Sequence, residues 1–385
     1  MAKRIGIFTY HFSENFGALM QAYGTRQWLI QQGHEAEFVN YHPRYVEEGG
    51  DFAGLLDPSR FRSNLKIAYL KLSRLQRKYL GNRQQAELFA AFHRDVLGVT
   101  GPRLETKEEV EAFLTSPEGR FDMLITGSDQ IWNPSDQKGL DPVYFLAFRP
   151  EVKARRVTYA PSFGRATLAA AYNEDVKTYI STVDGLSVRE QSGVSILRSI
   201  TGREAMCVPD PAILLGDFSS LVERAEPVRD GHVFCYALRS GDGIREVTEE
   251  VSRAVGAPIV SPYNVHRRWR EIGETVYPSP AGWVSLINNS EFSVTNSFHG
   301  TVLSILLQKP FLVVGLPGVK GGLNERAKDL LQKLELTDRF VEAGDVATAR
   351  RRIGEPIDWA KTSERLQAMQ KTGRDFLNMQ LEHIS

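Results

Sequence analysis

The sequence of 385 residues has few cysteines, no excess of charge and no long apolar run. Cys207 and Cys235 are its only cysteines, which are too few for a disulfide framework or a multi-cysteine zinc site and suit a reducing cytoplasm. Lysine plus arginine equal aspartate plus glutamate at 47 each, so no overall field attracts nucleic acid or a membrane. We therefore expect a cytoplasmic protein with no nucleic-acid partner, in which any anion is recognised locally.

Targeting and membrane-spanning segments are lacking as well. The basic start, Met1 to Arg4, is followed directly by Ile5, without the apolar run of a signal peptide. The most apolar region, Thr301 to Val319, is interrupted by Gln308-Lys309-Pro310 and falls short of the roughly 20 residues that span a bilayer. The sequence thus predicts a soluble protein.

A dinucleotide-binding fingerprint is absent from the place where an α/β protein would carry it. Ile5–Tyr10 is typical of a buried strand, Gly17–Gln32 of a helix and Glu37–Tyr41 of a second strand. The loop after the first strand holds one glycine instead of Gly-x-Gly-x-x-Gly, which argues against a dinucleotide site of the usual type. We expect neither a cofactor nor a metal, and Asn15 and Gly17 are candidates to face another ligand.

Polar loops follow two further predicted strands, Phe121–Thr126 and Arg156–Ala160. Because the carboxyl ends of parallel strands meet at one edge of a sheet, the loops should line one crevice. The candidate ligand-binding residues in these loops are Ser128, Asp129, Gln130 and Ser162.

Alternating strand and helix patterns continue to the C-terminus and indicate two α/β domains. We place the N-terminal domain at residues 1–183, with a helical insertion at about 50–95. The C-terminal domain takes residues 184–355, and a C-terminal helix takes 356–385.

The insertion has a strong charge bias. Arg60 to Arg83 contains eight lysines and arginines and no acidic residue, and it predicts a basic amphipathic helix. Two interpretations stay open: a solvated helix packed on the domain, or peripheral contact of residues 60–83 with the inner face of the membrane. The apolar residues at helical spacing are Leu65, Tyr69, Leu72, Leu75 and Tyr79.

The most informative stretch runs from Phe292 to Val314, as strand, loop, helix and strand. His299 falls in the first turn of the helix predicted to follow Ser297, a plausible N-cap. The helix dipole opposes a positive charge there, which favours a histidine able to exchange a proton in general acid/base catalysis. The alternative is that His299 only hydrogen-bonds a nearby carbonyl.

Five motifs occur in an order that resembles the polysaccharide pyruvyl transferase family. They are Asn15-Phe-Gly-Ala-Leu, Gly127-Ser-Asp-Gln-Ile-Trp, Leu186-Ser-Val-Arg-Glu, Pro209-Asp-Pro-Ala-Ile-Leu-Leu, and Ser297-Phe-His-Gly followed by Lys309-Pro310. The resemblance extends over roughly residues 5–340.

This resemblance implies two Rossmann-like domains facing a cleft, as in GT-B glycosyltransferases. It also implies transfer of a pyruvyl group from phosphoenolpyruvate to two hydroxyls of a sugar in a surface polysaccharide or its lipid-linked precursor, forming a ketal. His299 would be the acid/base residue and Arg189 a ligand of the donor. Many members have Arg-Leu-His-Gly where this chain has Ser297-Phe-His-Gly, so one expected cation is missing.

The implied binding residues fall into two sets. Besides Arg189, the donor-binding set comprises Ser297, Phe298, Gly300, Thr301, Asn324 and Arg326. The acceptor-binding set comprises Asn15, Gly17, Ser128, Asp129, Gln130 and Ser162. One of Arg267, Arg268 and Arg270 could also supply the missing cation.

The same residues are also compatible with two other functions. One is a sugar-nucleotide glycosyltransferase of GT-B type, with a diphosphate at the helix that contains Gly300. The other is a non-catalytic sugar-binding protein of polysaccharide assembly.

Overall fold

The computed structural model describes residues 2–47, 49, 52, 54, 61–135, 138–238, 243–263, 272–316 and 324–384. The chain divides into two compact units. Unit 1 comprises Met1–Ser13, Gln21–Pro211 and Gly373–Ser385, and unit 2 comprises Glu14–Met20 and Ala212–Thr372. The domain boundary expected near residue 184 differs from this division. Residues 184–211 stay in unit 1 because Gly185 bridges to Val157 and the strand after it pairs within the same unit.

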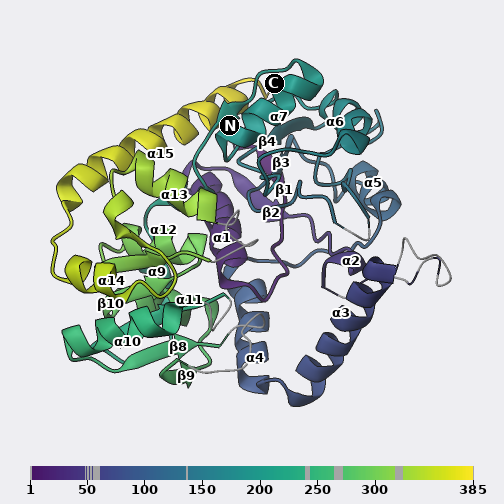
Figure 1. The fold of residues 1–385 in the computed structure, drawn as a ribbon. Coiled ribbons are helices and arrows are strands. Elements are labelled where there is room, and N and C mark those ends of the chain that lie inside the picture. Colours follow the sequence, from purple (N-terminus) through teal and green to yellow (C-terminus); the bar gives the residue numbers. More distant parts are fainter. Residues whose placement is uncertain are drawn as a thin grey trace. The chain divides into compact units, whose positions relative to one another are not determined.

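Unit 1 is built on a parallel sheet with strand order β2-β1-β3-β4 (Figure 1). Its strands are β1 (Arg4–Phe8), β2 (Glu35–Phe38), β3 (Met123–Thr126) and β4 (Arg155–Thr158). A second, two-stranded parallel sheet joins β5 (Ser187–Val188) to β6 (Met206–Cys207). All these strands are parallel, so the loops that follow β1, β3 and β4 leave the same edge of the sheet.

Helices surround these strands in unit 1. They are α1 (Phe16–Gln31, of which the part to Met20 belongs to unit 2), α2 (Arg44–Glu47), α3 (Phe61–Leu80), α4 (Arg83–Ala91), α5 (Lys107–Thr115), α6 (Asn173–Ile180) and α7 (Gln191–Thr201). The core holds large aromatic side chains, among them Trp132 stacked on Phe145 with ring centroids 4.5 Å apart. Such burial supplies the main driving force for folding this unit.

Unit 2 is built on a six-stranded parallel sheet with order β12-β11-β10-β7-β8-β9. Its strands are β7 (His232–Tyr236), β8 (Ile259–Pro262), β9 (Glu274–Val276), β10 (Ser290–Thr295), β11 (Phe311–Val314) and β12 (Phe340–Val341). Its helices are α8 (Pro211–Leu215, with Pro211 in unit 1), α9 (Ser219–Arg224), α10 (Ile244–Val255), α11 (Pro280–Asn288), α12 (Phe298–Leu306), α13 (Asn324–Lys333) and α14 (Val346–Ile353). Every residue of β7 and β11 is buried, as expected for strands covered on both faces.

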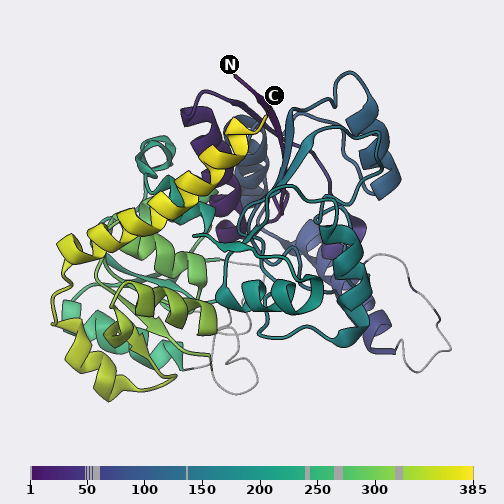
Figure 2. The same ribbon diagram turned by 90° about the horizontal axis from the view of Figure 1, so that it is seen from above.

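Helix α15 (Trp359–Glu382) is one long helix, drawn in yellow in Figure 2. Within unit 1, Gln380 accepts a hydrogen bond from Arg155 at 2.7 Å, which ties the end of α15 to β4. Figures 1 and 2 both show the two ends of the chain close together. Among the helices that the structure describes, none is long and apolar enough to cross a membrane.

Most predicted elements are confirmed, with shifts at their ends. The strand expected at Glu37–Tyr41 begins earlier, at Glu35, and ends at Phe38. Asn324 and Arg326, both assigned to the donor-binding set, lie in the first turn of α13. The basic segment forms α3 and, after a break at Gly81–Asn82, continues into α4.

Candidate functional site

In unit 2 the turn from β10 to α12 is held by side-chain hydrogen bonds. The Ser297 hydroxyl accepts a hydrogen bond from the Gly300 amide at 3.3 Å, so Ser297 is the predicted N-cap. The Thr301 hydroxyl donates to the Ser297 carbonyl at 3.0 Å, and the Ser297 amide donates to the Thr295 hydroxyl at 3.0 Å. Gly300 packs so tightly that a Cβ atom would lie 2.6 Å from the Thr295 hydroxyl oxygen. This turn is therefore rigid.

The imidazole of His299 is buried in the first turn of α12 and packs against the backbone of Gly17 in α1. A Cβ atom at Gly17 would lie 2.3 Å from Nδ1 of His299, 2.7 Å from Cγ and 2.9 Å from Cβ. Only glycine leaves room for the ring. Because Nδ1 and the base of the ring face Gly17, Nε2 is the nitrogen at the far side of the ring.

Asn15 and Gly17, expected on the acceptor side of the N-terminal domain, belong instead to unit 2. The Asn15 side chain accepts a hydrogen bond from the Ala18 amide at 3.2 Å and so caps α1. The starts of two helices, α1 and α12, thus meet at His299. Two helix N-termini at one point favour negative charge there.

Phe16, next to Gly17 in α1, belongs to a cluster of aromatic rings in unit 2. Phe16 stacks on Trp283 with ring centroids 5.4 Å apart, and Trp283 meets Tyr236 at 5.2 Å. Phe298 contacts the His299 ring edge to face at 5.3 Å. Phe16, Trp283 and Tyr236 are buried, and burial raises the pKa of the Tyr236 hydroxyl above its usual range. A charge placed here is therefore screened by little water.

Arg326 brings a cation beside this position. Its guanidinium carbon lies 5.7 Å from the centre of the Phe298 ring, and Phe298 is adjacent to His299 in α12. Asn324 fixes the start of α13, since its amide side chain pairs with both the amide (2.9 Å) and the carbonyl (3.0 Å) of Leu316. The predicted alternatives Arg267, Arg268 and Arg270 lie outside the described residues.

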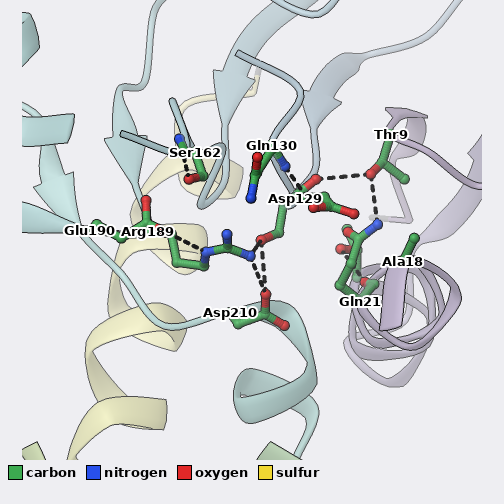
Figure 3. Close-up of polar contacts among 12 residues, drawn as sticks. Thr9, Ala18, Gln21, Asp129, Gln130, Ser162, Arg189, Glu190 and Asp210 are labelled. Atoms are coloured by element: carbon green, nitrogen blue, oxygen red, sulfur yellow. Dashed lines mark hydrogen bonds and ion pairs between the residues drawn. The ribbon is translucent and has the colours of Figure 1, made fainter. Parts of the chain in front are cut away.

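In unit 1 a second polar cluster surrounds Arg189, which follows β5 (Figure 3). Its guanidinium pairs with Glu190 at 2.8 Å and Asp210 at 3.0 Å, and it donates a hydrogen bond to the Ser128 hydroxyl at 3.2 Å. Ser128 in turn donates to Asp210 at 3.0 Å. Burial opposes the charge of Arg189, but the carboxylates of Glu190, Asp210 and Asp129 outweigh it and raise its pKa.

Arg189 therefore has a structural partner for its charge, although the sequence predicted that it binds the donor. Arg189 and Asp210 are both buried, and among the described groups the carboxylates of Glu190, Asp210 and Asp129 all act on the charge of Arg189. A further anion would meet repulsion here.

The loops after β3 and β4 carry the remaining predicted residues, Asp129, Gln130 and Ser162. Asp129 has φ +81°, a strained value for an aspartate, and its carboxylate accepts a hydrogen bond from the Gln130 amide at 2.7 Å. The Ser162 amide donates to the Asp129 carbonyl at 2.9 Å, while the Ser162 hydroxyl accepts from Gly164. Ser162 is buried, whereas Asp129 and Gln130 are partly exposed. Strain of this kind is often found at functional sites.

The structure separates the predicted residues into these two sets, one in each unit. Unit 2 brings together Asn15, Gly17, Ser297, Phe298, His299, Gly300, Thr301, Asn324 and Arg326, and unit 1 brings together Ser128, Asp129, Gln130, Ser162 and Arg189. Sequence reasoning missed the aromatic residues Phe16 and Trp283, for which no local pattern exists. It also missed Asp210, because nothing in the neighbouring sequence predicts that this carboxylate pairs with a buried arginine.

Comparison with known proteins agrees with this architecture. The family model "Polysaccharide pyruvyl transferase" matches residues 15–316. Three similar solved structures are UDP-N-acetylglucosamine 2-epimerases. One has a TM-score of 0.53 at 10% identity, covering 99% of this chain and 96% of that chain. The Neisseria meningitidis enzyme, bound to UDP-GlcNAc, has a TM-score of 0.51 at 9% identity, with coverage of 99% and 100%. The Rickettsia bellii enzyme has a TM-score of 0.50 at 10% identity, with coverage of 100% and 97%.

At these identities the similarity shows the fold, which is GT-B-like, as the sequence predicted. No curated protein matches the chain by sequence.

Proposed function

Because this chain belongs to the polysaccharide pyruvyl transferase family and is therefore a transferase, we propose that it moves a pyruvyl group from phosphoenolpyruvate to two hydroxyls of a sugar. The product is a cyclic ketal on a surface polysaccharide or its lipid-linked precursor. The observation that carries this proposal is the buried imidazole of His299, held where α1 and α12 begin.

The donor carries a phosphate and a carboxylate, and unit 2 offers features that attract both. The N-termini of α1 and α12 favour anions through their dipoles. The amides of Gly300 and Thr301, predicted to bind the donor, already donate to Ser297, so they are occupied. Arg326 is the cation that we assign to the donor, because a guanidinium can grip a carboxylate or phosphate with two parallel hydrogen bonds. Arg326 takes the role of the arginine that many relatives carry at position 297. It also takes the donor-binding role predicted for Arg189.

His299 is the general acid in this reaction, acting through Nε2 because its Nδ1 edge is covered by Gly17. It gives a proton to the methylene carbon of phosphoenolpyruvate, which leaves an oxocarbenium-like carbon. The first sugar hydroxyl adds to that carbon and returns its proton to His299. The second hydroxyl then replaces the phosphate, which leaves with the second proton. The products are one ketal and one hydrogen phosphate.

We assign the acceptor to the strand-end loops of unit 1. The carboxylate of Asp129 and the amide of Gln130 are suited to hydrogen bonds with sugar hydroxyls, and both are partly exposed. Asp129→Asn should lower the efficiency with the acceptor while the affinity for phosphoenolpyruvate stays unchanged.

The test is binding of phosphoenolpyruvate by calorimetry, followed by phosphate release when sugar acceptors are added. We expect His299→Ala to lower turnover by roughly 10²- to 10⁴-fold, the usual contribution of a general acid. Arg326→Gln should weaken phosphoenolpyruvate binding. The exposed residues His383 and Lys328 provide matched controls as His383→Ala and Lys328→Gln.

Three results would contradict the proposal. Turnover that survives in folded His299→Ala would show that His299 is not the general acid. Release of a nucleoside diphosphate from a nucleotide sugar, with no phosphate from phosphoenolpyruvate, would identify a glycosyltransferase instead. A protein that binds sugars but shows no turnover with either donor would be the non-catalytic alternative.

A further inference from the structure

One face of α3 exposes a continuous row of large apolar side chains. Phe61, Leu65, Tyr69, Leu72 and Leu75 are 67%, 60%, 53%, 66% and 52% exposed, respectively. They recur every three or four residues, so they form a stripe along one side of the helix. Scattered exposed apolar residues need no explanation, but a contiguous stripe indicates an interaction surface.

This stripe is not the face by which α3 packs on unit 1. Ile67 is only 2% exposed, and the backbone at Gly49 packs against Ile67 and Leu70. At 100° per residue, Ile67 and Leu70 point away from the stripe that contains Leu65 and Leu72. The prediction left open whether Leu65, Tyr69, Leu72, Leu75 and Tyr79 pack on the domain. The structure leaves the first four exposed, and the side chain of Tyr79 lies outside the described part of the helix.

Positive charges flank the stripe. Lys66 and Lys71 lie on opposite sides of it by helical position, and the segment Arg60 to Arg83 contains eight lysines and arginines without an acidic residue. The ammonium of Lys71 lies 4.8 Å from the centre of the Phe52 ring, whose side chain is 45% exposed. Long basic side chains can cover apolar surface with their methylenes while the charge reaches the polar headgroups.

We propose that the stripe of α3 lies in the interface of a membrane that contains anionic lipids, with the flanking lysines at the headgroups. An apolar stripe bordered by charge of one sign is the pattern of an interfacial helix. A second copy of this chain fits less well, because two-fold pairing through the same stripe would bring Lys66 and Lys71 of one copy close to those of the other. An anionic lipid surface complements both features.

This inference is independent of the reaction, and its test requires no turnover. The full chain is sedimented with vesicles of phosphatidylcholine alone or of phosphatidylcholine mixed with phosphatidylglycerol. We expect association only with the anionic vesicles at low salt, and its loss near 1 M salt, where the screening length falls to about 3 Å. Each basic residue removed should weaken binding roughly fivefold, which corresponds to about 1 kcal/mol.

Two pairs of substitutions test the apolar stripe and the positive charge of α3 separately. Leu65→Ser with Leu72→Ser should reduce association at least tenfold at low salt, and Lys66→Gln with Lys71→Gln should reduce it and flatten its salt dependence. Ile30→Ser, Met379→Ser and Lys177→Gln change exposed residues outside α3 and should leave association unchanged. Circular dichroism checks that each variant is folded.

Three outcomes would overturn the proposal. The first is no association with anionic vesicles at low salt. The second is association that the α3 variants do not weaken. The third is a dimer in analytical ultracentrifugation that dissociates in Leu65→Ser with Leu72→Ser while vesicles stay unbound, which would assign the stripe to a second copy of the chain.

Discussion

The close packing of His299 on Gly17 predicts the effect of adding one methyl group at position 17. In Gly17→Ala the added carbon would lie 2.3 Å from Nδ1 of His299, whereas ordinary contacts begin at 3.4 Å. The ring must therefore move by about 1 Å. Rotation about the last side-chain bond cannot relieve the contact, because Cγ and Cβ of His299 are also too close, at 2.7 Å and 2.9 Å.

The size of the effect follows from the need for precise placement of a general acid. A displacement of about 1 Å can cost about 10²-fold in rate, so Gly17→Ala should lower kcat by roughly that factor. Because Gly17 contacts the side chain that we propose as the general acid, the loss should appear mainly in kcat, with less change in the affinity for phosphoenolpyruvate. Overpacking should also destabilise the fold, by about 1–3 kcal/mol.

The assay compares phosphate release and urea unfolding in four proteins: the parent, Gly17→Ala, His299→Ala and the double variant. Once His299 is alanine, the contacts with Nδ1 and Cγ are gone and only the 2.9 Å contact with Cβ remains. Gly17→Ala should therefore destabilise the His299→Ala protein less than it destabilises the parent. Gly354→Ala adds a methyl group where nothing lies within 4 Å and serves as the control. Full turnover in Gly17→Ala would refute the reasoning, since the ring would then tolerate displacement.

Three further predictions concern other parts of the chain. Ser297→Arg, which restores the residue of many relatives, should not speed phosphate release and should cost about 1 kcal/mol in thermal unfolding, because the hydroxyl that caps α12 is lost. Arg189→Met should cost about 3–5 kcal/mol in urea unfolding, since the buried carboxylate of Asp210 would lose its ion pair with Arg189, whereas phosphoenolpyruvate affinity should change little. A stable variant with weakened affinity would restore Arg189 as a donor ligand. Burial lowers the pKa of His11 from 6.5 to about 4, so the unfolded chain binds a proton that the folded chain does not, and stability should fall as pH falls from 6.5 to 4. The slope approaches about 1.4 kcal/mol per pH unit, for a total of roughly 3 kcal/mol, and a slope in denaturant titrations that His11→Gln leaves unchanged would contradict this assignment.

Local sequence patterns were sufficient to predict most helices and strands and the two-unit α/β class of the fold. The strand–loop–helix pattern around His299 predicted both the N-cap at Ser297 and the position of the imidazole in the first helical turn, and both are present. These features depend on residues close in sequence, so their signals are local. The boundary at residue 184 was less predictable, because the pairing that keeps Gly185 in unit 1 depends on Val157, far away in the chain.

The sequence by itself therefore determined the chemistry available: a histidine at a helix start, glycine-containing turns and a helix with one sign of charge. Only the tertiary structure decided the partners of these residues. It placed Gly17 beneath the His299 ring and Arg326 beside Phe298, and it surrounded Arg189 with Asp210 and Glu190. The physical reason is that ion pairs and close packing depend on distances between chain segments remote in sequence, which no periodicity records. Exposure of the α3 stripe was decided in the same way, because the opposite face of that helix, which carries Ile67 and Leu70, packs against Gly49.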